Sequence, residues 1–194
     1  VQPLSAITNA ARCGHEHGLV VHLDGARMMN AVVRLGISPA DLVADVDTVS
    51  LCLSKGLGAP VGTILAGPKS FIRRAHRIRK LVGGGMRQSG VLAAAGLYAL
   101  DHHIDRLASD HDNALRLAEQ LAAIPGVTAN PAAVETNMVF VDFAEGAGVR
   151  LRDHLAAKGI LIVADSDHVR LVTHLDCGVP EVDQFTAAVR DFFT

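Results

Sequence analysis

One uncharged apolar segment constrains the fold of this chain most. Residues 48–54, TVSLCLS, follow Asp47 and lead directly into Lys55 and a glycine-rich run that ends at Gly62. A strand with continuous apolar character is typical of a sheet that is covered on both faces, as in α/β proteins. Apolar runs at residues 19–24 and 63–67 predict two more short strands, with helices between them. The sequence therefore predicts an α/β fold in which these strands belong to a larger sheet.

The C-terminal part of the chain has a second pattern of this kind. Strands are predicted at residues 137–143, 159–164 and 169–174, with helices at residues 148–158 and 180–193. This set forms its own small layer, so we expect two domains with a boundary near residues 105–125. We assign residues 1–110 to a partial large domain and residues 111–194 to a small C-terminal α/β domain.

Composition excludes several classes of function. The chain has 194 residues, of which 49% are hydrophobic and 20% are charged, and its formal net charge is −2. This balance supports a packed core, and nothing in it attracts nucleic acid or an anionic membrane over a whole face. No apolar run reaches the ~20 residues of a membrane span, and no secretory signal is visible. The sequence opens at Val1 in a helix-like segment, from which we expect an upstream segment to be missing.

The cysteines predict the compartment. Cys13, Cys52 and Cys177 are scattered and form no C-x-x-C pair. This pattern predicts neither a disulfide framework nor a metal site, and it favours a reducing compartment, the cytoplasm. Adjacent His102 and His103 would point apart on a helix, so we expect no metal site there either.

Two side chains that follow predicted strands suit one cofactor. Lys55 comes directly after the strand at residues 47–54, and Asp24 ends the strand at residues 19–24. Ligands of α/β sheets bind outside the carboxyl ends of the strands, where an amine and a carboxylate can converge. A partly desolvated lysine is a competent nucleophile toward an aldehyde. The pair suits pyridoxal 5'-phosphate (PLP), because a lysine holds its aldehyde and a carboxylate keeps its pyridine nitrogen protonated.

Simpler interpretations of both residues stay open. Lys55 could be a surface lysine in a turn, and Asp24 could be the N-cap of the helix that follows it. Two arginines are candidates for binding a substrate carboxylate, because a guanidinium grips it with two parallel hydrogen bonds. Arg27 lies one helical turn past Asp24, and Arg170 lies in an otherwise apolar strand, where a buried arginine requires an anionic partner. Surface salt bridges are the alternative for both.

Five blocks of sequence carry a resemblance to a known family. They are VHLDGARMMNA at residues 21–31, SLCLSKGLGAPVG at 50–62, RKLVGGGMRQSG at 79–90, ETNMVF at 135–140 and VRLVTH at 169–174. They occur in family order over nearly the whole chain, and they resemble the low-specificity L-threonine aldolases. These are fold-type-I PLP-dependent enzymes of the β-eliminating lyase superfamily. The resemblance covers only the carboxyl-terminal portion of such an enzyme.

The resemblance implies a reaction and a set of roles. The reaction is reversible cleavage of L-threonine or L-allo-threonine to glycine and acetaldehyde. Lys55 would carry the cofactor covalently, Asp24 would pair with its pyridine nitrogen, and Arg27 and Arg170 would bind the substrate carboxylate. Arg27 would also lie near the phenolic oxygen of PLP. The loop at residues 83–87 would lie near the cofactor pocket or a subunit interface.

The resemblance also implies what this chain lacks and how it assembles. The histidine that stacks on the PLP ring, the phosphate-binding turn and the base for the β-hydroxyl are expected upstream of Val1. We therefore expect the isolated chain to bind PLP poorly. Relatives assemble as homodimers or homotetramers, and we expect the same here. The acidic run DSDH before Arg170 departs from the family pattern.

Three alternatives are distinguished by experiment rather than by residues. The chain could belong to another PLP-dependent β-eliminating lyase or to an aminotransferase relative, or it could be a non-catalytic truncated chain. Products separate the first two from a threonine aldolase, and PLP titration separates the third.

Overall fold

A computed structural model describes residues 1–194 and divides them into two compact units, Val1–Asp105 and Arg106–Thr194. Each unit has its own sheet and is described by itself. Both contain helices and strands, so the predicted α/β class is confirmed. The predicted domains, residues 1–110 and 111–194, stay a prediction, because compactness alone does not show that a segment folds independently.

The first unit is built on the three strands that the sequence predicts. They are β1 (His22–Asp24), β2 (Thr48–Cys52) and β3 (Thr63–Ala66), in the order β1-β2-β3. β1 runs parallel to β2, whereas β3 is antiparallel to β2. No residue of β2 is exposed, as its apolar sequence predicts, but all four residues of β3 are exposed. The expected cover on both faces therefore holds at β2 and not at β3.

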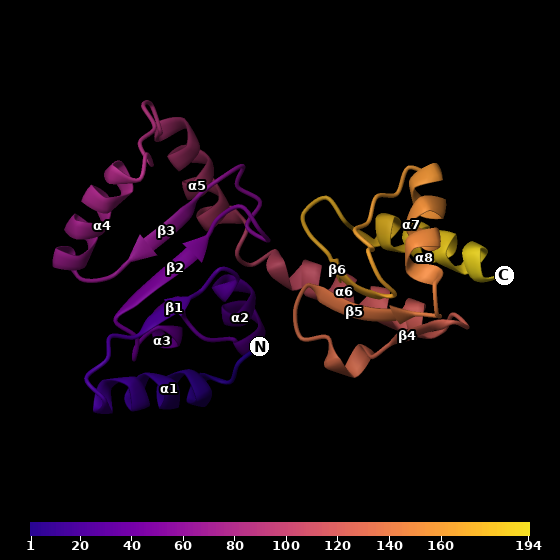
Figure 1. The fold of residues 1–194 in the computed structure, drawn as a ribbon, viewed down its shortest axis with the longest axis horizontal. Coiled ribbons are helices and arrows are strands. Elements are labelled where there is room, and N and C mark those ends of the chain that lie inside the picture. Colours follow the sequence, from indigo (N-terminus) through magenta and orange to yellow (C-terminus); the bar gives the residue numbers. More distant parts are fainter. The chain divides into compact units, whose positions relative to one another are not determined.

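Five helices accompany this sheet (Figure 1). They are α1 (Leu4–Glu16), α2 (Met28–Leu35), α3 (Pro39–Leu42), α4 (Lys69–Leu81) and α5 (Gly90–His102). Ser38 caps α3 as predicted, since its hydroxyl accepts the Asp41 N–H while Asp41 accepts the Ser38 N–H. α4 differs from the others because it has no buried residue.

The second unit is an antiparallel sheet with helices. Its sheet has the order β4 (Val127–Ala129), β5 (Met138–Phe143), β6 (His168–Val172). The helices are α6 (Leu107–Ala122), the short 3-10 helix η1 (Pro131–Ala133), α7 (Ala147–Ala157) and α8 (Val179–Phe193). Its core contains Leu121, Val141, Leu151, Leu155 and Val189, which are fully buried.

One strand predicted for this unit is absent, and one strand was not predicted. Residues 159–164 form no strand. Their side chains do alternate between two sides: Ile160 and Ile162 pack against the core, whereas Leu161 and Val163 are 85% and 81% exposed. The alternation of sides is present, but no neighbouring strand pairs with the segment, and alternation without pairing does not make a strand. Conversely, the sequence analysis missed β4, because three residues carry too short a pattern to be detected.

None of the helices combines the length and apolarity needed to cross a membrane.

Candidate active site

Asp24 is the last residue of β1, and its backbone is held tightly against β2. Asp24 lies opposite Ser50 in the parallel pairing. The next residue, Gly25, donates its N–H to the Ser50 carbonyl over 2.9 Å. The Asp24 carboxylate accepts the N–H of Ala26 at 3.1 Å through Oδ1 and remains exposed. The turn after β1 thus presents a carboxylate at the carboxyl end of the strand.

Lys55 begins a turn three residues beyond the end of β2. Gly58 donates its N–H to the Lys55 carbonyl at 2.8 Å, and Ala59 donates to the Leu53 carbonyl at 3.0 Å. The Lys55 side chain is exposed and forms no hydrogen bond or ion pair. The partial desolvation that we expected of its amine is therefore not observed in this chain.

The parallel pairing places both residues at one edge of the sheet. Since β1 and β2 run in the same direction, their carboxyl ends meet at the same edge. Asp24 pairs with Ser50, and Lys55 follows β2 on the same side of that pairing. The convergence of a carboxylate and an amine that the sequence predicts is thus compatible with the topology. The roles of both residues in binding a cofactor stay predictions.

Arg27 is at the N-cap of α2 and lies beside the turn of Lys55. It lines a small cavity together with Asn30 of α2, Cys52 of β2, and Gly56 and Leu57 of the turn. The side chain is partly buried, and its Nε is buried without a hydrogen-bond partner. A buried N–H without an acceptor is costly, and it is often found where a ligand supplies the acceptor. An anionic group at this position would satisfy it.

Arg170 lies in the other unit, on β6, and the prediction that it is buried is wrong. It pairs with Phe140 of β5, and its side chain is exposed while those of Val169 and Leu171 are buried. The strand is apolar on one face only, and Arg170 projects from the other. Arg170 also lines an open apolar cavity of about 410 Å³. Its role in binding a substrate carboxylate stays a prediction.

The acidic residues before Arg170 bind other groups. The Asp167 carboxylate accepts the N–H groups of Gly146 and Gly148, both at 2.8 Å, and these bonds lower the pKa of Asp167. Asp165 lies 4.0 Å from the guanidinium of Arg152. Neither carboxylate forms an ion pair with Arg170. The acidic residues that depart from the family pattern therefore do not neutralise Arg170.

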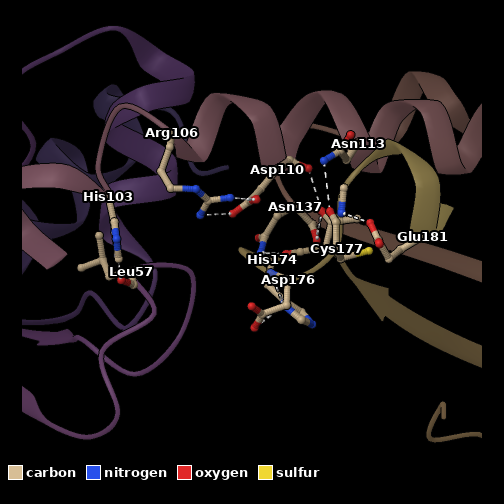
Figure 2. A network of polar contacts seen from close by, with 12 residues as sticks. Leu57, His103, Arg106, Asp110, Asn113, Asn137, His174, Asp176, Cys177 and Glu181 are labelled. Carbon is tan, nitrogen blue, oxygen red and sulfur yellow. Dashed lines mark hydrogen bonds and ion pairs between the residues drawn. The ribbon is translucent and has the colours of Figure 1, made fainter. Parts of the chain in front are cut away.

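Two residues near Lys55, Cys52 and His103, have contacts that the sequence did not predict. The Cys52 thiol lies 3.3 Å from the Ser54 hydroxyl. Burial raises the pKa of Cys52, but hydrogen bonds with Ser54 and the positive charge of Lys55 outweigh it, so that the pKa of Cys52 is lowered. His103, at the end of α5, lies with Nδ1 2.6 Å from the Leu57 carbonyl oxygen (Figure 2). No spacing signal exists for this contact, because it joins residues 46 positions apart.

No group of three or more His, Cys, Asp or Glu side chains is arranged to hold a metal ion.

Comparisons with known proteins identify a family. A family model described as beta-eliminating lyase matches residues 1–144. The low-specificity L-threonine aldolase of Escherichia coli (strain K12) is 44% identical over 192 residues, which are 99% of this chain and 56% of that protein. Low-specificity L-threonine aldolase 1 of Arabidopsis thaliana is 48% identical over 162 residues, 81% of this chain and 45% of that protein.

A solved structure shows the same fold. The threonine aldolase of Leishmania major superposes with a TM-score of 0.74 at 18% identity, covering 98% of this chain and 57% of that one. At this identity the likeness concerns the fold alone. The chain spans about half the length of the curated relatives it matches.

Proposed function

The chain belongs to the beta-eliminating lyase family, and we propose that it is the lysine-bearing part of a PLP-dependent threonine aldolase. The enzyme would cleave L-threonine or L-allo-threonine to glycine and acetaldehyde. One observation supports this proposal above others. Parallel strands β1 and β2 bring the ends that carry Asp24 and Lys55 to the same edge of the sheet, beside the guanidinium of Arg27.

The residues present fit the polar groups of PLP. The Lys55 amine is accessible and has no internal partner. One oxygen of the Asp24 carboxylate, Oδ1, accepts the Ala26 N–H, and no basic side chain forms an ion pair with the carboxylate. The buried Nε of Arg27 lacks an acceptor, and a substrate carboxylate or the phenolic oxygen of PLP could supply one. When bound, PLP would act as an electron sink for the substrate carbon that loses its bond.

Each residue then has a distinct task. Lys55 would bind the cofactor aldehyde through Nζ, and Asp24 would keep the pyridine nitrogen protonated by accepting its N–H. Arg27 would bind the substrate carboxylate with parallel hydrogen bonds, and Arg170 would add a second contact to that carboxylate. A base must also take the proton of the β-hydroxyl. We assign that base to no residue of this chain.

Replacing Lys55 in the enzyme that contains this chain tests the proposal. The parent should show an absorbance band of bound PLP near the visible edge and should release acetaldehyde from threonine. Lys55→Ala should lose both. Lys69→Ala is the matched control, because Lys69 is exposed on α4 and should leave both unchanged. A band that survives Lys55→Ala, with acetaldehyde still formed, would refute the assignment.

Two alternatives are decided by the same preparation. Pyruvate or another keto acid in place of acetaldehyde would indicate a different β-eliminating lyase or an aminotransferase. A non-catalytic chain is the second alternative. Titration of the 194-residue chain with PLP, followed by an acetaldehyde assay, decides this. Stoichiometric binding with turnover would exclude the non-catalytic alternative.

Self-association into a homodimer or homotetramer belongs to the proposal. It is supported by apolar side chains that α4 and the following loop leave exposed, namely Ile78, Leu81, Val82 and Met86 at 53–78%. Exposed apolar patches of this kind mark protein interfaces. We further propose a cytoplasmic location and a small amino acid as the only partner besides the cofactor. Sedimentation of the purified protein tests the assembly.

A further inference from the structure

We infer that His103 is a positioning residue for Lys55: its imidazole holds the turn from which the lysine projects. The inference rests on the proposed function, because it concerns how the amine of Lys55 is presented to an aldehyde.

The contact joins the end of α5 to the middle of the Lys55 turn. His103 follows the last residue of α5, and its own N–H donates to the Ala99 carbonyl at 2.9 Å, so its backbone is still held by the helix. From there the ring reaches the Leu57 carbonyl, with Nδ1 at 2.6 Å (Figure 2). Leu57 lies between Lys55 and Gly58, the two residues whose backbone hydrogen bond closes the turn. His103 therefore binds the turn at its centre.

The chemistry of the two groups fixes the direction of this bond. A carbonyl oxygen can only accept, so Nδ1 of His103 must carry the hydrogen. This holds for the neutral ring with hydrogen on Nδ1 and for the imidazolium, so protonation of His103 does not remove the bond. The hydrogen bond between His103 and Leu57 is consequently kept in both forms of the ring and does not act as a pH switch.

The surroundings keep the ring in place. His103 is partly buried, and the ring of Tyr98 meets it edge-on, with centroids 5.4 Å apart and planes at 85°. The Leu57 side chain is 3% exposed, so the turn is anchored by an apolar contact as well. The hydrogen bond from His103 also fixes the orientation of the Leu57 carbonyl, because burial of the Leu57 side chain alone would leave that carbonyl free to rotate. Rotation of the peptide after Leu57 would change the turn and the direction of Lys55.

Two variants separate the hydrogen bond from the shape of the ring. His103→Phe keeps a ring of similar size and removes the donor. His103→Asn removes the ring but keeps an N–H donor in nearly the position of Nδ1. If the bond positions Lys55, the Asn variant should behave like the parent and the Phe variant should not.

The readout is covalent labelling of lysines in the enzyme that contains this chain. PLP is added, borohydride reduction fixes the linkage, and peptide mass spectrometry measures the rate at each lysine. Lys69 on α4 serves as an internal reference. We expect His103→Phe to slow labelling of Lys55 about tenfold, the factor that corresponds to a lost hydrogen bond of about 1.4 kcal/mol. The labelling rate of Lys69 should not change. In His103→Asn the labelling rate of Lys55 should be within about twofold of the parent, a difference smaller than the loss of one hydrogen bond would cause.

Amide hydrogen exchange gives a second readout that needs no cofactor. The N–H groups of Gly58 and Ala59 are bonded within the turn and should exchange faster in His103→Phe but not in His103→Asn. Equal Lys55 labelling and equal exchange in the parent and the Phe variant would overturn the inference, as would an Asn variant that fails like Phe. If Lys55 of the parent is labelled no faster than Lys69, the proposed function fails. Exchange at Gly58 then still decides whether His103 holds the turn.

Discussion

Gly25 approaches Ser50 so closely that a side chain at position 25 has no room. A Cβ on Gly25 would lie 2.8 Å from the Ser50 carbonyl oxygen and 3.1 Å from the Met28 sulfur. The same approach forms the 2.9 Å hydrogen bond that holds the turn after Asp24. The position of the Asp24 carboxylate therefore depends on a glycine that touches β2.

This contact predicts a cost for Gly25→Ala. The backbone carbonyl cannot move without breaking the sheet, so we expect a loss of about 1–3 kcal/mol in the free energy of unfolding. Gly90→Ala is the control, because nothing lies within 4 Å of a Cβ there and alanine favours the helix it would join. Urea unfolding followed by circular dichroism measures both. Equal stability of the two variants would show that the turn can shift.

We expect the ion pair between Arg106 and Asp110 of α6 to contribute strongly to the free energy of unfolding. Asp110 is fully buried, and both carboxylate oxygens accept from the guanidinium of Arg106 one turn earlier (Figure 2). Arg106→Ala would leave a buried charge without its partner, which costs about 3–5 kcal/mol.

An exposed pair provides the comparison. Arg152 and Asp153 are 37% and 66% exposed, so Arg152→Ala should cost about 0–1 kcal/mol. The difference is measured by urea unfolding at neutral pH. An Arg106→Ala variant as stable as Arg152→Ala would mean that water reaches Asp110.

Asp167 predicts a dependence of stability on pH. The N–H groups of Gly148 and Gly146 lower its pKa in the folded chain. A lowered folded pKa means that the unfolded chain binds the proton more readily. The stabilisation is therefore present above the unfolded pKa of about 3.9 and is lost as pH falls through the folded value.

Asp167→Asn should remove this contribution. The variant should be less stable than the parent at pH 7, and the two should approach each other as the pH falls below the unfolded value of about 3.9 and Asp167 becomes protonated. Asp165→Asn is the control, since its side chain is 88% exposed and its nearest cation is 4.0 Å away. Unfolding curves measured from pH 7 to pH 2.5 would contradict the prediction if the gap between parent and Asp167→Asn did not narrow.

The cysteines should differ in reactivity. Burial raises the pKa of Cys52, but Ser54 and the positive charge of Lys55 outweigh it and lower that pKa overall, whereas burial raises the pKa of Cys177, helped by Glu181 and Asp110. Iodoacetamide reacts with the thiolate, so at pH 8 it should label Cys52 several-fold faster than Cys177. Ser54→Ala should slow Cys52 and leave Cys177 unchanged. Mass spectrometry of the labelled peptides gives the rates, and equal rates at the two thiols would contradict the prediction.

Local chemistry could be predicted from the sequence alone because its causes lie within a few residues. Ser38 and Pro39 begin α3 because a serine N-cap followed by proline favours a helix start. The apolar run before Lys55 forms β2 because a strand in a covered sheet buries such a run. The five blocks identified the family, and with it the residues proposed to hold a cofactor.

Contacts between distant segments were decided only by the tertiary structure. Residues 159–164 have the alternation of a strand but no partner, and pairing cannot be read from one segment. Arg170 is exposed because β6 turns its other face to the core, and the Leu57 carbonyl is held by His103 across 46 positions. The sequence by itself determined which side chains could do the chemistry. Folding decided which of them are buried, paired or left without a partner, because burial and hydrogen bonding depend on segments that the chain brings together.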